Sequence, residues 1–215
     1  MRIIGGSAAG RFVKVPSGYD VRPTPDLVRQ AIFNSLGGRV DGARVLDLFS
    51  GSGAIGLECL SRGAASVLSV EKAGRHAAMI RQNLELTELP ADRHELRVQD
   101  VLIVLRQLAE SQRTFDLILA DPPFGDKNVG KRSTSLSQRL LDDEYLPRLL
   151  SPDGLLVLGH TKRDTLTLTS PWEETKEMKH GDSMMRFLRL KSAVPTSTPA
   201  STATLADVPT SPPSP

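Results

Sequence analysis

The strongest constraint on the fold is the alternation of short apolar runs with segments of helical spacing between residues 43 and 160. The apolar runs predict strands at 43–49, 65–71, 94–100, 114–124 and 154–160, and helices are predicted at 52–63, 74–89, 101–111 and 135–150. Strands that alternate with helices form βαβ units, and these build a mostly parallel sheet with helices on both faces. Ligands of such sheets bind where the strands end.

Both ends of the chain depart from this pattern. The runs "RIIGG" (2–6) and "RFVKVP" (11–16) predict a small hairpin, and 24–36 predicts a helix with Thr24 as N-cap and Pro25 as its first helical residue. Segments 165–169 and 183–190 predict a final pair of strands. Segment 192–215 is rich in Pro, Ser and Thr, and we predict that it is disordered. The predicted division is therefore a hairpin-and-helix extension (1–40), an α/β domain (41–191) and a tail (192–215).

Composition excludes several classes of protein. The single cysteine, Cys59, rules out a disulfide framework, and the four histidines lack the spacing of metal ligands, so we predict no metal. No apolar run approaches the roughly 20 residues that cross a bilayer, and the N-terminus lacks a signal peptide. We therefore expect a cytoplasmic protein, a monomer without membrane contact. A phosphate loop of the form G-x-x-x-x-G-K-[ST] is missing, which argues against ATP hydrolysis.

The stretch "DLFSGSGAIG" (47–56) follows the first predicted strand and contains G-x-G-x-x-G at Gly51, Gly53 and Gly56. With Glu71 twenty residues further on, this is the spelling of a dinucleotide-binding loop. However, Asp47 lies close to the position of a bound pyrophosphate and would repel it. A carboxylate there suits S-adenosylmethionine, which has a cationic ammonium and sulfonium and no phosphate.

The other predicted strand ends supply further acceptors. Glu71 can accept from ribose hydroxyls in either kind of ligand, Asp100 can accept from an adenine amine, and Val101 can pack on the adenine ring. No residue suited to a nicotinamide stands out. The motif therefore favours S-adenosylmethionine, while an NAD-dependent oxidoreductase stays open as the alternative.

The segment "DPPF" (121–124) follows the fourth predicted strand. Its two prolines supply no N–H donors, Asp121 adds a carboxylate, and Phe124 offers a flat face for stacking. Such a site accepts both hydrogens of an exocyclic amine of a nucleobase, and the carboxylate stabilises the positive charge that develops on the nitrogen during methylation. Cytosine C5-methylation is not expected, because it needs a nucleophilic cysteine and Cys59 is predicted to face the core.

The motifs "VLDLFSGSGAIGLECLSRGA", "VE" at 70–71 and "LADPPF" resemble those of class I, Rossmann-like, S-adenosylmethionine-dependent amino-methyltransferases. The segments "MRIIGG" and "RPTPDLVRQAIFNSL" resemble, more specifically, the bacterial family that methylates a guanine N2 in 16S ribosomal RNA, the RsmD family. The resemblance covers about residues 1–190. It implies a seven-stranded sheet with an antiparallel last strand, and a small ribosomal subunit or its RNA as partner.

The resemblance and the residues together predict a site with three groups of side chains. The catalytic residues are Asp121, Pro122, Pro123 and Phe124. The cofactor-binding residues are Asp47, Phe49, Ser50, Gly51, Ser52, Gly53, Glu71, Lys72, Asp100 and Val101. The RNA-binding residues, taken from two basic clusters, are Arg2, Arg11, Lys14, Arg22, Lys127, Lys131 and Arg132. The prediction is guanine-N2 methylation of 16S ribosomal RNA, with adenine-N6 methylation of DNA or RNA and a catalytically silent RNA-binding protein as further alternatives.

Overall fold

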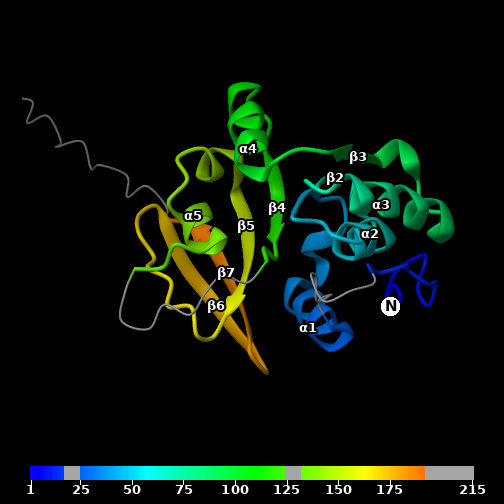
Figure 1. Ribbon diagram of the computed structural model, residues 1–215, viewed down its shortest axis with the longest axis horizontal. Coiled ribbons are helices and arrows are strands. Elements are labelled where there is room, and N and C mark those ends of the chain that lie inside the picture. Colours follow the sequence, from blue (N-terminus) through cyan, green and yellow to red (C-terminus); the bar gives the residue numbers. More distant parts are fainter. Residues whose placement is uncertain (17–24, 124–131, 192–215) are drawn as a thin grey trace, which may run out of the picture.

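The computed structural model describes residues 1–16, 25–123 and 132–191 of the 215-residue chain, and these form a seven-stranded sheet with helices on both faces (Figure 1). The helices are α1 (Asp26–Leu36), α2 (Ala54–Ser61), α3 (Gly74–Thr87), α4 (Val101–Glu110) and α5 (Leu136–Leu141). The strands are β1 (Arg44–Leu48), β2 (Ser66–Val70), β3 (His94–Arg97), β4 (Phe115–Ala120), β5 (Leu150–Thr161), β6 (Trp172–His180) and β7 (Ser183–Leu190). The predicted α/β fold is confirmed.

The strand order is β3-β2-β1-β4-β5-β7-β6. Strands β1 to β5 pair with one another in parallel, whereas β7 is antiparallel to both of its neighbours, β5 and β6. The chain runs outward from β1 to β3 and then returns to β4 on the other side of β1. Ligands of open α/β sheets bind outside the carboxyl ends of the strands at such a reversal. The topology therefore points to the ends of β1 and β4.

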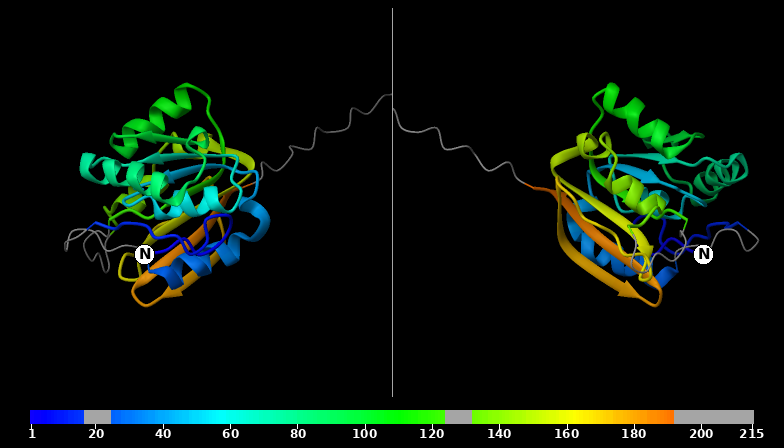
Figure 2. Two further views of the ribbon diagram at one scale, coloured as in Figure 1. Left: turned by 90° about the vertical axis from the view of Figure 1, so that its right-hand side faces the viewer. Right: turned by 60° about the vertical axis from the view of Figure 1, so that its left-hand side comes forward.

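Two hydrophobic clusters hold the layers together. One cluster joins the N-terminal segment, α1 and α2 to one face of the sheet, with Ile3, Ile32 and Leu57 among its buried members. The other joins α4 and α5 to the opposite face through residues such as Val104 and Leu140. Figure 2 shows α4 (green) and α1 (blue) on opposite sides of the sheet. Burial on both faces explains why the central strands read as continuous apolar runs.

Residues 1–16, here called the N-terminal arm, form the predicted hairpin. Arg2 and Phe12 make an antiparallel bridge, and Ile3 N–H donates to the Arg11 carbonyl at 3.0 Å. The fully buried carboxylate of Glu58 on α2 accepts from the N–H groups of Ile4 and Gly5 at 2.7 and 2.8 Å. The arm is therefore fixed against α2, beside α3 (Figure 1). The division of the chain at residue 40 stays a prediction.

Two helix boundaries differ from those predicted. Helix α1 begins at Asp26, because Pro25 has an extended ψ of 148° and occupies the N-cap position; Thr24 lies outside the described residues. The helix predicted over 135–150 is divided into α5 and a 3-10 turn at Leu146–Leu149. The division follows from Asp143, whose carboxylate accepts from the N–H groups of Tyr145 and Leu146 and so begins a new turn.

The predicted strand at 165–169 was wrong, and β7 pairs instead with β6 at Trp172–His180. The side-chain amide of Gln138 on α5 satisfies the backbone of Thr167: it accepts from the Thr167 N–H at 2.7 Å and donates to its carbonyl at 3.0 Å. A side chain thus takes the place of a neighbouring strand. Nearby Leu166 is buried in the second cluster and anchors the segment.

Candidate active site

The loop between β1 and α2 makes an abrupt turn, in which three residues have φ angles in the left-handed region. Gly51 and Gly53 have φ angles of 56° and 78°, and Phe49, which is not a glycine, has a φ of 59°. A non-glycine residue in this region is held there by its surroundings and is a frequent feature of functional sites. Here the Ser50 N–H donates to the Val70 carbonyl at 3.0 Å and fixes the start of the turn on β2.

Asp47, on β1 before this loop, is almost completely buried, with 2% of its surface exposed. Its Oδ2 accepts from the Gly56 N–H at 3.2 Å. Burial raises the pKa of its carboxyl from 3.8 to about 7; the hydrogen bonds from Ser50 and Gly56 lower it, and the charges of Glu71 and Asp121 raise it again. The charges of two further carboxylates, Glu71 and Asp121, therefore act on Asp47 at the strand ends. Such a site favours a cationic ligand and disfavours a pyrophosphate.

Glu71 follows β2 and holds the glycine loop directly. Its two carboxylate oxygens accept from the N–H groups of Gly51 and Ala73, both at 2.8 Å. His76 on α3 lies beside it, with Nδ1 3.6 Å from Glu71 Oε1. The carboxylate therefore lies next to the loop in one fixed orientation, as the recognition of ribose hydroxyls requires.

Asp100 does not end a strand as predicted, because β3 stops at Arg97. It is the N-cap of α4 and accepts from the Leu102 N–H at 3.1 Å. Lys72 forms an ion pair with it at 3.0 Å and is the main cause of the lowered pKa of its carboxyl. Val101 is buried in the second cluster. The predicted cofactor residues thus surround the ends of β1, β2 and β3, with Ser52 buried in the loop itself.

The predicted catalytic segment begins directly after β4, the strand paired with β1. Asp121 is half-buried, Pro122 is buried, and Pro123 is exposed; Phe124 lies outside the described residues. Asp121 packs against Gly159 on β5 so closely that an added Cβ at Gly159 would overlap the Asp121 Oδ1 atom. Because β4 pairs with β1 and the charge of Asp121 acts on Asp47, the predicted amine site lies beside the glycine loop.

Among the predicted RNA-binding residues that the structure describes, Arg2, Arg11 and Lys14 lie on the N-terminal arm, and Arg132 lies just before α5. The Arg2 guanidinium lies 4.7 Å from the exposed Phe12 ring, and Arg11 binds the Thr87 carbonyl and the Glu88 carboxylate. Arg132 forms an ion pair with Asp142 at 2.7 Å, and the side chain of Lys14 is exposed. Arg22, Lys127 and Lys131 lie outside the described residues. A role in RNA binding stays a prediction for all seven.

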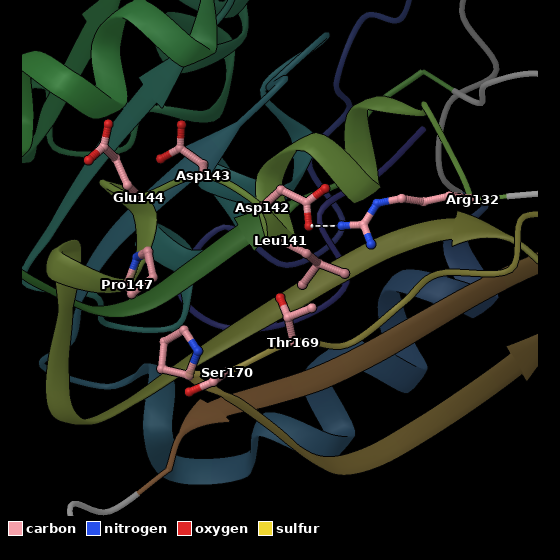
Figure 3. A pocket seen from close by; sticks show the side chains of 9 residues that line it. Arg132, Leu141, Asp142, Asp143, Glu144, Pro147, Thr169 and Ser170 are labelled. Atoms are coloured by element: carbon pink, nitrogen blue, oxygen red, sulfur yellow. Dashed lines mark hydrogen bonds and ion pairs between the residues drawn. The ribbon is translucent and has the colours of Figure 1, made fainter.

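A hollow of about 590 Å³ lies between the end of α5 and the segment before β6 (Figure 3). It is lined by Arg132, Leu141, Asp142, Asp143, Glu144, Pro147, Thr169, Ser170 and Pro171. In Figure 3 the side chain of Arg132 points toward Asp142 at the edge of this hollow, where the two form an ion pair. Arg132 alone among the predicted site residues lines it, so this acidic hollow is separate from the glycine loop.

Three residues near the loop were not identified from the sequence: His76, Asn83 and Gly159. Asn83 is fully buried, and its Nδ2 donates to the Ser52 carbonyl at 2.8 Å. His76, Ile80 and Asn83 share one face of α3 by their spacing of four and three residues. Polar residues on an otherwise apolar helical face are the signal that could have identified two of them. Gly159 gives no such signal, because only the packed structure brings it against Asp121.

These residues fit S-adenosylmethionine. An added Cβ at Gly56 would lie 2.9 Å from Asp47 Oδ2, and one at Gly53 would lie 3.2 Å from Ile80, so glycine at these positions lets the loop and the start of α2 pack closely against β1 and α3. The acceptors suit a cationic ligand with a ribose.

Within the described ranges, His, Cys, Asp and Glu do not gather in any group of three that could hold a metal ion. Nor does any helix in these ranges have the length and apolar character needed to cross a membrane.

The fold and this centre define a class I, Rossmann-like, S-adenosylmethionine-dependent methyltransferase. The chain belongs to the family described as Conserved hypothetical protein 95, the RsmD family, whose sequence profile matches residues 1–189. It is 32% identical over 181 residues to ribosomal RNA small subunit methyltransferase D of Haemophilus influenzae. The matched region covers 84% of this chain and 89% of that protein.

Solved structures share the fold, including the following two. The Escherichia coli protein yhhF, provisionally assigned as a methyltransferase, is 27% identical with a TM-score of 0.71, over 90% of this chain and 99% of that one. The 16S ribosomal RNA N2 G1207 methyltransferase of Thermus thermophilus, solved with S-adenosylmethionine and guanosine, is 24% identical with a TM-score of 0.59. The match covers 80% of this chain and 44% of that one, and it is a likeness of fold alone.

Proposed function

We propose that this protein methylates the exocyclic N2 amine of a guanine in 16S ribosomal RNA. Family membership and a relative that is named a small subunit ribosomal RNA methyltransferase support the substrate class. The observation that carries the chemistry is the position of Asp121 and Pro122 directly after β4, where the charge of Asp121 acts on Asp47 at the end of β1. An enzyme with this substrate works in the cytoplasm.

The amine site binds and orients its substrate by accepting hydrogen bonds. The Asp121 carboxylate and the Pro122 carbonyl bind the two amine hydrogens, and neither proline can donate in competition. S-adenosylmethionine, when bound, supplies an electrophilic methyl group on a sulfonium. Asp121 stabilises the positive charge that develops on the nitrogen, and alignment of the nitrogen supplies much of the rate enhancement. The alkylated nitrogen is acidic, so a strong general base is not required.

The substrate base must leave its stack, because an amine inside a helix cannot reach Asp121. The lone pair of an exocyclic amine is delocalised into its ring, which makes orientation more important than basicity. An adenine N6 amine meets the same two acceptors and is therefore the alternative that an experiment must separate from guanine N2.

Methylation of 16S RNA by the purified protein tests the proposal. The protein is incubated with labelled S-adenosylmethionine and either naked 16S RNA or 30S particles, and nucleosides are then identified by mass spectrometry. We expect N2-methylguanosine at one position. N6-methyladenosine would replace the proposal with its alternative. Tight binding of NADH in calorimetry, with no binding of S-adenosylhomocysteine, would contradict both.

A further inference from the structure

Asn83 on α3 joins two segments that lie far apart in the sequence. Its Oδ1 accepts from the Lys14 N–H at 2.8 Å, and its Nδ2 donates to the Lys14 carbonyl at 2.9 Å. The same Nδ2 donates its second hydrogen to the Ser52 carbonyl at 2.8 Å. One fully buried amide therefore connects the N-terminal arm to the glycine loop.

The orientation of this amide is fixed by its partners. Because Lys14 presents both a donor and an acceptor, a flipped Asn83 amide would place its NH₂ group against the Lys14 N–H. It would also place oxygen against the Ser52 carbonyl. The arm thus determines which way the Asn83 amide faces, and the amide in turn holds Ser52.

Ser52 is a position at which the loop is supported by α3. It lies between Gly51 and Gly53, two residues with wide conformational freedom and left-handed φ angles here. Glu71 binds the Gly51 N–H on one side, and Asn83 binds the Ser52 carbonyl on the other. Ile80, one turn before Asn83, lies beneath Gly53. Together they hold the loop in one conformation before any ligand arrives.

The arm is attached to the same helix at a second point. Arg11 donates to the Thr87 carbonyl at 2.9 Å, and its guanidinium pairs with Glu88 at 2.8 Å. Thr87 lies one turn beyond Asn83, and its hydroxyl donates to the Asn83 carbonyl at 2.7 Å. Arm and helix therefore form a single support for the loop.

We propose that Asn83 is a positioning residue for the cofactor loop, and that through it the N-terminal arm sets the affinity for the cofactor. The ordering entropy of a loop with two glycines opposes binding unless the loop is ordered in advance. A contact that holds the arm in place then strengthens cofactor binding, although the arm itself is hydrogen-bonded to α2 and α3. The inference concerns the cofactor, so it can fail while the proposed RNA substrate stands.

The test compares S-adenosylhomocysteine affinity by calorimetry, without RNA, in Asn83→Ala, Asn83→Asp and Arg11→Ala. Asn83→Ala leaves Ser52 unsupported, and we expect roughly tenfold weaker binding. Asn83→Asp keeps the acceptor for Lys14 but turns an oxygen toward the Ser52 carbonyl, so we expect a loss at least as large. Arg11→Ala loosens the arm alone and should weaken binding by roughly threefold.

Gln138→Ala is the matched control. Gln138 is also a buried amide that clamps both backbone groups of one residue, Thr167, but it lies on α5 away from the loop. We expect it to lower the melting temperature without changing cofactor affinity.

If the Asn83 variants keep their cofactor affinity within twofold and have a lowered melting temperature like Gln138→Ala, Asn83 is merely structural and the proposal is wrong. Unchanged affinity in Arg11→Ala would refute the contribution of the arm. Should Asn83→Ala not fold, the other two variants decide the outcome.

Discussion

At the scale of one residue, the buried carboxyl of Asp47 lowers the stability of the protein near neutral pH. Its pKa of about 7 lies above the value of 3.8 for a free carboxyl, mainly because of burial. The folded state therefore retains the proton between about pH 4 and pH 7, where the unfolded state has already released it. The free energy of unfolding consequently falls as pH rises through this window. A cationic ligand beside Asp47 would offset this loss.

Asp47→Asn should remove this pH dependence. We expect the variant to gain stability relative to the native protein by roughly 2–3 kcal/mol between pH 5 and pH 8, measured by urea unfolding of both proteins at each pH. Asp116→Asn is the control, because Arg44 lowers the Asp116 pKa to about 2 and its contribution is constant over this range. A difference between Asp47→Asn and the native protein that does not change with pH would show that Asp47 has no raised pKa.

Asp121→Ala should separate catalysis from cofactor binding. The substitution removes one acceptor of the proposed amine site, whereas Glu71 and Asn83 still bind the backbone of the glycine loop. We expect kcat to fall by roughly 10²–10³, as for the loss of one group that stabilises transition-state charge, with S-adenosylhomocysteine affinity within twofold. Full methyl transfer by this variant would remove Asp121 from the mechanism.

At the scale of elements, the packing of β5 against the end of β4 determines where the Asp121 carboxylate lies. Gly159 on β5 leaves the space that Asp121 fills. Gly159→Ala should displace that carboxylate and lower kcat by at least roughly tenfold, with little change in cofactor affinity. Gly154→Ala is the control: its Cβ would lie 2.8 Å from Leu150 Cγ at the other end of β5, so it should reduce stability and preserve kcat. Equal kcat values in the two variants would contradict the role of Gly159.

Elements also show how far the sequence predicts the structure. The central strands could be predicted because burial on both faces makes them continuously apolar, and the glycine loop because its turn needs left-handed residues. Strand β6 could not, because its charged edge sequence, "WEETKEMKH", has no apolar alternation. The segment "TLTLT" has the composition of a strand, yet Gln138 satisfies its backbone. Asn83 and Gly159 depend on contacts between distant segments, which spacing alone does not reveal.

For the whole molecule, the sheet brings four segments to one edge: the glycine loop, the end of β2, the cap of α4 and the end of β4. The N-terminal arm is fixed to α2 and α3 behind this edge by Glu58 and Asn83. The proposed cofactor and amine sites are thus held by one sheet, and in the proposed reaction the substrate changes conformation by unstacking its base.

The most direct test of the central claim is nucleoside mass spectrometry of 16S ribosomal RNA from cells that lack the gene. The account predicts the loss of N2-methylguanosine at a single position, its return when the native gene is supplied, and no return with the Asp121→Ala gene. An unchanged N2-methylguanosine pattern in the deletion strain would contradict the proposed function.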